Sequence, residues 1–341
     1  MRRLNVLVPV LCALALALLG PWLSPYASDF VVKVMILSIF ALSLELLVGM
    51  TGLVSLGHAA FYGIGAYATV LGSGADGGSI AWLLPLAVGA AAAYALVVGA
   101  LSLRTRGVYF IMVTLAFAQM AYFVFHDTKV GGGSDGIYMY VRPALGMLDM
   151  ENRRVQFYVV LAALAGTYGL LALIGRSRFG AALAGIRVNE QRMRAAGFPV
   201  YGYKLAAFVL AGALAGLAGF LVAARDGVVN PELLAWHNSG EVLLMIILGG
   251  LGRLRGAVIG AVAFTLLKEV LSTHALVGPL ADHWQLTLGL AIIAFVALLP
   301  KGIIGIAARL SPAGGERVAA PAVVPPTPHA RTGARPTEVR P

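Results

Sequence analysis

Long apolar runs alternate with short polar segments over most of the chain. Each run is close to the roughly 20 residues that a helix needs to cross the hydrocarbon of a bilayer. The pattern predicts an all-α fold, a polytopic membrane bundle of about ten transmembrane helices within a domain over residues 1–310. The runs lie near residues 4–23, 30–48, 52–72, 80–102, 107–125, 155–174, 204–224, 241–252, 256–272 and 284–300.

The run at 241–252 is shorter than the others. As a helix it would reach only about 18 Å, so it is either a crossing or a re-entrant half-helix. Charge favours a crossing. Ten crossings place every basic segment on one side of the membrane and both termini in the cytoplasm, whereas nine would leave Arg253 and Arg255, or the C-terminus, on the wrong side. The basic segments are Arg2–Arg3, Arg104–Arg106, 176–204, Arg253–Arg255 and Lys301–Arg309.

Composition agrees with a membrane protein. Hydrophobic residues make up 60% of the chain and charged residues 12%, and a soluble core of this size cannot hide so much apolar surface. The net charge of +10 comes from short segments between apolar runs rather than from a basic patch with interleaved aromatics, which argues against nucleic acid as a partner.

Residues for covalent chemistry are scarce. The single cysteine, Cys12, can form neither an intrachain disulfide nor a cysteine metal cluster, and the six histidines have no metal-ligand spacing. No nucleophile–base pair or paired acids occur within the spans, so we expect no catalytic residues, no metal and no cofactor.

The third run carries glycines and polar side chains at membrane depth. Glycine lets helices approach closely, or lets a helix unwind beside a transport pathway. The run is therefore either a tight helix–helix seam or part of a substrate pathway, and the two are compatible. The candidate pathway residues are Ser55, Gly57, His58, Tyr62 and Tyr67. Glu45, late in the preceding run, either snorkels or caps a neighbouring helix, or takes part in transport.

Residues 175–203 form the most informative polar segment. Helix formers without proline predict a surface helix over 179–196, and Gly197 and Pro199 supply the stop. The helix is either interfacial, lying on anionic lipid, or a docking helix for a cytoplasmic partner.

A glycine-rich segment, 131–136, is predicted on the outer side. Gly132, Ser134 and Asp135 either contact a substrate or a delivery protein, or belong to a plain flexible loop. A phosphate-binding loop is excluded because no lysine in the chain follows a glycine. Residues 311–341 are rich in Pro and Ala and are predicted to be a disordered cytoplasmic tail.

Several stretches together resemble the LivM-type permease subunits of bacterial branched-chain amino acid ABC importers. They follow one another in the family's order and cover roughly residues 30–305. The stretches are GLVSLGHAAFYGIGAYATVL (52–71), RTRGVYFIMVTLAFAQM (104–120), GGGSDGI (131–137), GRSRFGAALAGIRVNE (175–190), KLAAFVLAGALAGLAGFL (204–221) and GGLGRLRGAVIGA (249–261).

The resemblance implies a multi-pass protein of the bacterial inner membrane and four protein partners besides lipid: a second, LivH-type permease, two cytoplasmic ATPase subunits and a periplasmic binding protein. The ATP sites would lie on those separate subunits. It also implies that the 175–203 loop couples to the ATPases. The candidate coupling residues are Arg178, Arg187, Glu190 and Gly197. The family usually has small residues after the glutamate, where this chain has Arg192 and Met193.

The expected function is translocation of branched-chain or other hydrophobic amino acids by alternating access. Two alternatives remain open. A related ABC permease for urea, amides or organic and aromatic acids would have nearly the same membrane motifs. An ion-coupled secondary transporter would place carboxylates at mid-membrane, where this chain offers only Glu45.

Overall fold

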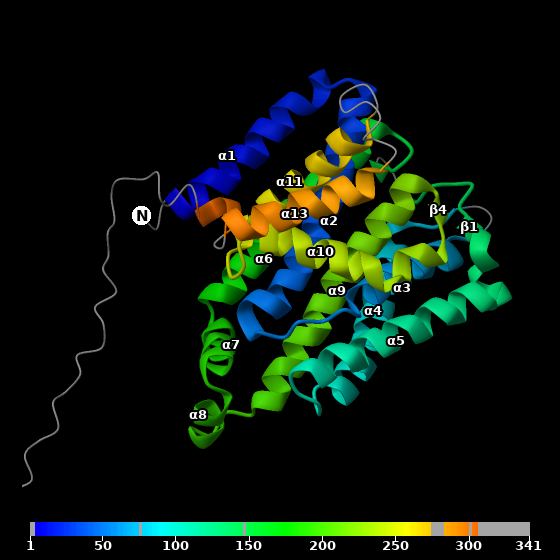
Figure 1. Cartoon of the computed structure of the whole chain (residues 1–341). Coiled ribbons are helices and arrows are strands. Elements are labelled where there is room, and N and C mark those ends of the chain that lie inside the picture. The colour runs from blue at the N-terminus through cyan, green and yellow to red at the C-terminus, as the bar shows by residue number, and fades with distance from the viewer. Residues whose placement is uncertain (1–3, 75–76, 146–147, 274–282, 300–301, 306–341) are drawn as a thin grey trace, which may run out of the picture.

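The computed structural model describes residues 4–74, 77–145, 148–273, 283–299 and 302–305. The chain forms a bundle of long helices from which two short helices, α7 and α8, project at one end (Figure 1). The helices are α1 Leu4–Leu19, α2 Pro25–Glu45, α3 His58–Ser73, α4 Ile80–Ser102, α5 Val108–Asp127, α6 Arg153–Arg176, α7 Arg178–Val188, α8 Glu190–Ala195, α9 Val200–Asp226, α10 Trp236–Gly249, α11 Leu254–Ser272 and α13 Trp284–Leu298.

Short turns and strands complete the described chain. A π-helical turn, η2 (Leu46–Thr51), prolongs α2, and four 3-10 turns are η1 Gly20–Trp22, η3 Lys129–Gly131, η4 Gly133–Asp135 and η5 Pro231–Leu234. Two antiparallel strand pairs join β1 (Ile137–Tyr138) to β4 (Val228–Val229) and β2 (Ala144–Leu145) to β3 (Leu148–Asp149). These pairs are too short to change the predicted all-α class, which is confirmed.

Each of the ten predicted apolar runs contains a helix, but their number as membrane crossings stays a prediction. Among the described residues, five helical segments are long and apolar enough to cross a bilayer, or six if α10 and α11 form one bent span. The helices α1 and α3 each have 16 residues, about 24 Å, so they are shorter than a membrane core of about 30 Å. The tail and its predicted disorder lie outside the described residues.

The predicted third span is not helical throughout. Gly52 takes a left-handed conformation with φ of 75° and ends η2, and helix α3 begins only at His58. Residues 52–57 therefore cross part of the bundle as irregular backbone. Such backbone is tolerated at membrane depth only where protein surrounds it. Ser55 and Gly57 are buried and meet that condition, whereas Gly52 at the start of the stretch is exposed.

Helix α2 lies at the centre of the bundle. In the segment Pro25–Thr51, 83% of an 18-residue apolar stretch is buried, against 22% for α5. It packs against α6, α9 and α11, while α9 packs in turn against α3 and α4. A helix that is apolar on all sides suits this position because every face meets another helix.

Glycine and alanine make the contacts of α9 close. A β-carbon at Gly212 or Gly216 would overlap the β-carbons of Ala95 and Ala91 on α4. On its other side, a β-carbon at Gly219 would overlap the carbonyl oxygen of Tyr62 on α3. Gly212, Gly216 and Gly219 thus form a small-residue face, with Gly-x3-Gly spacing between the first two, that lets α3, α9 and α4 pack with almost no side chain between their backbones.

Gly256 and Gly260 on α11 form a second small-residue face, which packs against α10. Helices α10 and α11 are bent by 114° at their connection and pack against each other. Gly256 and Gly260 lie against the backbone of Gly250 and Met245, leaving no room for a side chain. At about 21 Å, the 14-residue α10 is too short to cross the membrane upright, so the pair forms either a broken span or a re-entrant loop.

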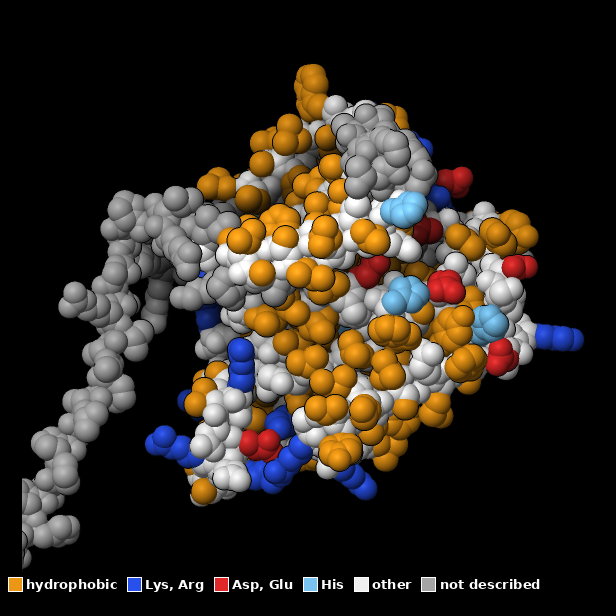
Figure 2. All heavy atoms as spheres, viewed as in Figure 1, with side chains coloured by type: hydrophobic (Ala, Val, Ile, Leu, Met, Phe, Trp, Pro, Cys, Tyr) orange, Lys and Arg blue, Asp and Glu red, His pale blue; other side chains and the backbone are white. Residues whose placement is uncertain are grey.

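Charge is unevenly distributed over the surface. Figure 2 shows apolar side chains across the face formed by α5, α10 and α13, with Lys and Arg gathered at the end of the molecule that carries α7 and α8. Exposed arginines there include Arg104, Arg106, Arg176 and Arg178. This separation is typical of a membrane protein whose basic end is cytoplasmic.

We predict that Gly219→Ala lowers the free energy of unfolding by about 1–3 kcal/mol, because the added methyl group must displace the α3 backbone. Gly89→Ala is the matched control, since a β-carbon at this exposed α4 position would meet nothing within 4 Å. The thermal midpoint of the detergent-solubilised protein measures the difference. Equal midpoints for both variants would show that the α3–α9 contact is not tight.

Candidate functional site

The polar segment 175–203 folds as two helices joined at Asn189. The single predicted helix over 179–196 is wrong, because Asn189 takes an extended conformation between α7 and α8. Its backbone N–H donates to the Gly185 carbonyl at 3.0 Å and closes α7. Its side-chain oxygen accepts from the Arg192 N–H at 2.9 Å and caps α8. One asparagine therefore ends one helix and starts the next.

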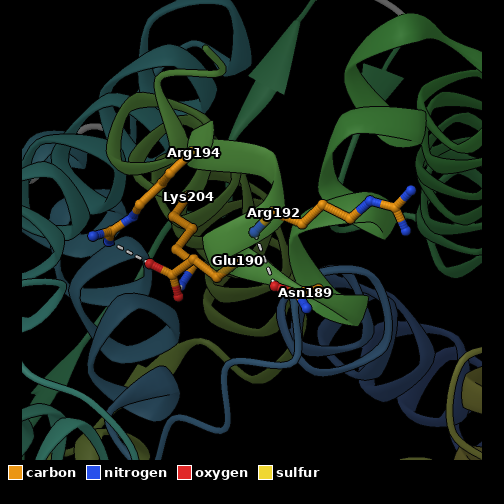
Figure 3. A network of polar contacts seen from close by, with 5 residues as sticks. All are labelled: Asn189, Glu190, Arg192, Arg194 and Lys204. Carbon is orange, nitrogen blue, oxygen red and sulfur yellow. Dashed lines mark hydrogen bonds and ion pairs between the residues drawn. The ribbon is translucent and has the colours of Figure 1, made fainter. Parts of the chain in front are cut away.

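Glu190 fixes α8 against the membrane bundle. It is the first residue of α8, and its carboxylate accepts a hydrogen bond from Lys204 at the start of α9 at 2.7 Å. The same carboxylate pairs with Arg194 one turn later, whereas the Arg192 side chain points away from it (Figure 3). Partial burial acts to raise the pKa of the Glu190 carboxyl, but Lys204 and Arg194 outweigh it and hold that pKa below its ordinary value.

The end of α8 follows the sequence prediction. Gly197 has φ of 83° and stops the helix, and Pro199 precedes the first residue of α9. The ring of Tyr203 on α9 stacks on Phe179 of α7 with centroids 5.5 Å apart. The two short helices are thus held at several points to the start of α9, so they can move with that helix rather than as a loose loop.

The other two coupling candidates have different environments. Arg178 is exposed, and its side chain forms no hydrogen bond or ion pair within the described part of the chain. The guanidinium of Arg187 instead turns toward the bundle and donates a hydrogen bond to the carbonyl of Gly49 in η2. That these residues couple to an ATPase stays a prediction.

The pathway candidates of the third run are packed inside the bundle. The Ser55 hydroxyl accepts from the Gly57 N–H at 3.2 Å, and Gly57 lies against the backbone of Thr114 on α5. His58 is fully buried, with its Nε2 2.8 Å from the Ser43 hydroxyl on α2. Its Nδ1 has no hydrogen-bond partner among the described residues.

The two tyrosines extend the same packing toward the far end of α3. Tyr62 stacks on Phe40 of α2 with centroids 4.5 Å apart. Tyr67 stacks on Phe125 and donates a hydrogen bond to the Gly131 carbonyl at 3.2 Å. These contacts support the seam interpretation, and a role of the five residues in a substrate pathway stays a prediction.

The glycine-rich segment at the opposite end is an ordered turn. Gly132, Gly133 and Gly136 all take left-handed conformations, and the chain continues into β1, which pairs with β4 after α9. Ser134 and Asp135 are exposed, and the Ser134 hydroxyl donates to the Asp135 carboxylate at 3.3 Å. Contact with a substrate or delivery protein stays a prediction.

Two side-chain hydrogen bonds between distant residues could not be predicted from the sequence. Glu190 meets Lys204 over 14 positions and Arg187 meets Gly49 over 138 positions, and neither separation carries a local signal. Within the described residues, no group of three or more His, Cys, Asp or Glu side chains could hold a metal ion. Helices α7 and α8 are thus held to the start of α9 at the basic end of the bundle, and we call this helix pair the α7–α8 joint.

Comparison with known proteins confirms the resemblance seen in the sequence. Residues 26–297 match the family described as branched-chain amino acid transport system / permease component. The chain is 29% identical over 320 residues to the high-affinity branched-chain amino acid transport system permease protein LivM of Salmonella typhimurium, spanning 86% of this chain and 74% of that protein. It is also 29% identical to LivM of Escherichia coli over 316 residues, spanning 85% and 73%. No solved structure matches.

The lowered pKa of Glu190 generates a pH prediction. The stability that its ion pairs give to α8 is complete above the ordinary carboxyl pKa, about 4.3, and is lost as the pH falls through the lower folded value. We expect the hydrogen-bonded backbone amides of α8 to lose protection as the pH falls below the ordinary carboxyl pKa. Hydrogen exchange, corrected for its intrinsic pH dependence, measures this. The same step in Glu190→Gln would contradict the assignment.

Proposed function

The chain belongs to the family of permease components of branched-chain amino acid transport systems, and on that premise we propose that it is a membrane subunit of an ATP-driven importer. Proteins of this kind are permeases, and the chain is not an enzyme. The proposed cargo is branched-chain or other hydrophobic amino acids, and the proposed location is the bacterial inner membrane, with both termini in the cytoplasm. The helical bundle with a basic end supports this location.

The proposed complex also contains a LivH-type second permease, two cytoplasmic ATPases and a periplasmic binding protein. The observation that carries the proposal is the α7–α8 joint. It projects from the basic end of the bundle, yet Glu190 and Tyr203 hold it to α9. A helix pair that is exposed on one side and anchored on the other suits the transfer of motion from a partner. The ATP sites are assigned to other chains because this sequence has no Gly-Lys pair for a phosphate-binding loop.

Alternating access is the proposed mechanism. The close contacts between α3, α4 and α9 make these helices one rigid unit, while η2 and the 114° bend between α10 and α11 interrupt regular helices nearby. Rigid groups that rock about such interruptions open a path alternately to the two sides. Ser55, His58 and Tyr62 would border that path when the seam between α2 and α3 opens.

We expect a complex of this chain, its companion permease, ATPases and binding protein, reconstituted in vesicles, to import radiolabelled leucine with ATP. Glu190→Ala should remove most of the uptake while the complex still assembles, because α8 loses its link to α9. Glu151→Ala removes an exposed acid from another segment and is the control.

Several outcomes would contradict the proposal. Uptake that continues after the ATPases are inactivated would exclude an ATP-driven importer. Loss of uptake on adding an uncoupler, with ATP held constant, would favour the ion-coupled alternative. A complex that assembles and hydrolyses ATP without importing leucine would overturn the amino-acid assignment, and urea and organic acids would then be tested.

A further inference from the structure

Two breaks in regular helix meet beside α7 at the basic end of the bundle. Helix α2 does not end as an α-helix but winds into the π-helical η2, which Gly52 terminates with φ of 75°. The bent connection between α10 and α11 contains Gly250 and Gly252, with φ of 117° and 81°. Turns of π-helix are rare in proteins, and those within α-helices occur frequently at functional sites.

The Arg187 side chain links α7 to both breaks. Its guanidinium donates to the carbonyl of Gly49 within η2. A β-carbon at Gly52 would lie 3.3 Å from the Arg187 Cγ, and one at Gly252 would lie 3.4 Å from its Nη1. Because both neighbours are glycines, the arginine has room to pass between the end of α2 and the α10–α11 connection. A cation at the C-terminal end of a helix also suits the dipole of α2.

A buried carboxylate completes the group. Glu45, the last residue of α2, is only 2% exposed, and its side chain lies against the α-carbon of Gly49. It lies close to the backbone amides of Gly252 and Arg253 and within the electrostatic reach of Arg187. Its Oε2 has no hydrogen-bond partner among the described residues. A carboxylate buried without a close ion pair is unfavourable for stability, so a purely structural helix end has no need of one.

We propose that Glu45 and Arg187 are positioning residues that carry motion from the α7–α8 joint to η2 and the α10–α11 connection. We call this group, with Gly49 and Gly252, the cytoplasmic junction. The inference rests on the proposed transport function and names the atoms that would serve it. When α7 moves, the arginine draws the Gly49 carbonyl with it and η2 changes register. The Glu45 side chain, which lies between Gly49 and the amides of the connection, keeps η2 and the connection together during that movement.

A static brace would behave differently from a transmitting junction. If the junction only held the fold together, its loss would lower the amount of assembled complex, while each assembled complex would still import the same number of solute molecules per ATP. If it transmits motion, its loss leaves ATP hydrolysis running and lowers that number. The ratio of leucine imported to ATP hydrolysed therefore separates the two roles.

The test uses the complete reconstituted complex. We expect Arg187→Ala to lower the number of leucine molecules imported per ATP by about tenfold, as for the loss of one charged hydrogen bond. Arg176→Ala is the matched control, because it removes an exposed arginine at the end of α6 whose side chain makes no hydrogen bond or ion pair within the described residues, and its ratio should equal that of the wild type. Glu45→Gln should lower the ratio too, and the double variant should be no worse than the stronger single one.

Each other outcome has a defined meaning. A ratio for Arg187→Ala equal to that of Arg176→Ala overturns the junction. If Arg187→Ala does not assemble, Arg187→Lys and Glu45→Gln decide. Lysine keeps the charge without the fork that reaches both partners, and unchanged ratios in both variants overturn the proposal. A wild-type complex that hydrolyses ATP without importing leucine contradicts the proposed cargo instead, and the junction is then tested with the solute that it does import.

Discussion

The approach of backbone to backbone along α9 is the contact on which the rest of the bundle depends. Apolar side chains gain little by leaving lipid for another helix, so association in a membrane relies on close packing and hydrogen bonds. Gly212, Gly216 and Gly219 remove the side chains that would keep α3 and α4 apart from α9. Helix α9 also packs against α2, and α6 and α11 cover other sides of that helix, so that most of its apolar stretch is buried. A single larger side chain on this face would separate helices that come from two distant parts of the chain.

The same requirement explains where the chain is allowed to be irregular. Unpaired backbone groups in lipid are strongly unfavourable, so breaks in helices survive only inside protein or beside water. In the irregular stretch 52–57, Ser55 and Gly57 are buried and Gly57 lies against Thr114 of α5, and just beyond it the Ser239 hydroxyl of α10 accepts from the Ala59 N–H at 2.8 Å. The connection between α10 and α11 lies beside η2 and Arg187. The irregular segments near η2 and the α10–α11 connection thus lie beside the short helix α7 at the basic end, where the proposed alternating access would require movement.

The carboxyl groups of Glu190 and Glu45 lie in different surroundings and have different effects on the structure. Glu190 is partly exposed, pairs with Lys204 and Arg194, and fixes α8 to α9. Glu45 is buried and meets Arg187 only at longer range. A solvated pair contributes little to stability but sets orientation, whereas a buried, incompletely paired carboxylate is unfavourable for stability. Both acids lie on the path from α8 into the bundle.

Much of this protein follows from sequence alone. Apolar runs, loop charges and Gly-x3-Gly spacing determine an all-α membrane protein, the residues of each long helix and the small-residue faces, because these properties depend on local pattern and on the length of a membrane core. The stop at Gly197 was predictable for the same reason. Only the tertiary structure decided that Asn189 divides the surface helix, that 52–57 is not helical, and that Arg187 reaches Gly49. These features depend on partners far away in the chain, and no local spacing records which distant backbone will lie beside a given side chain.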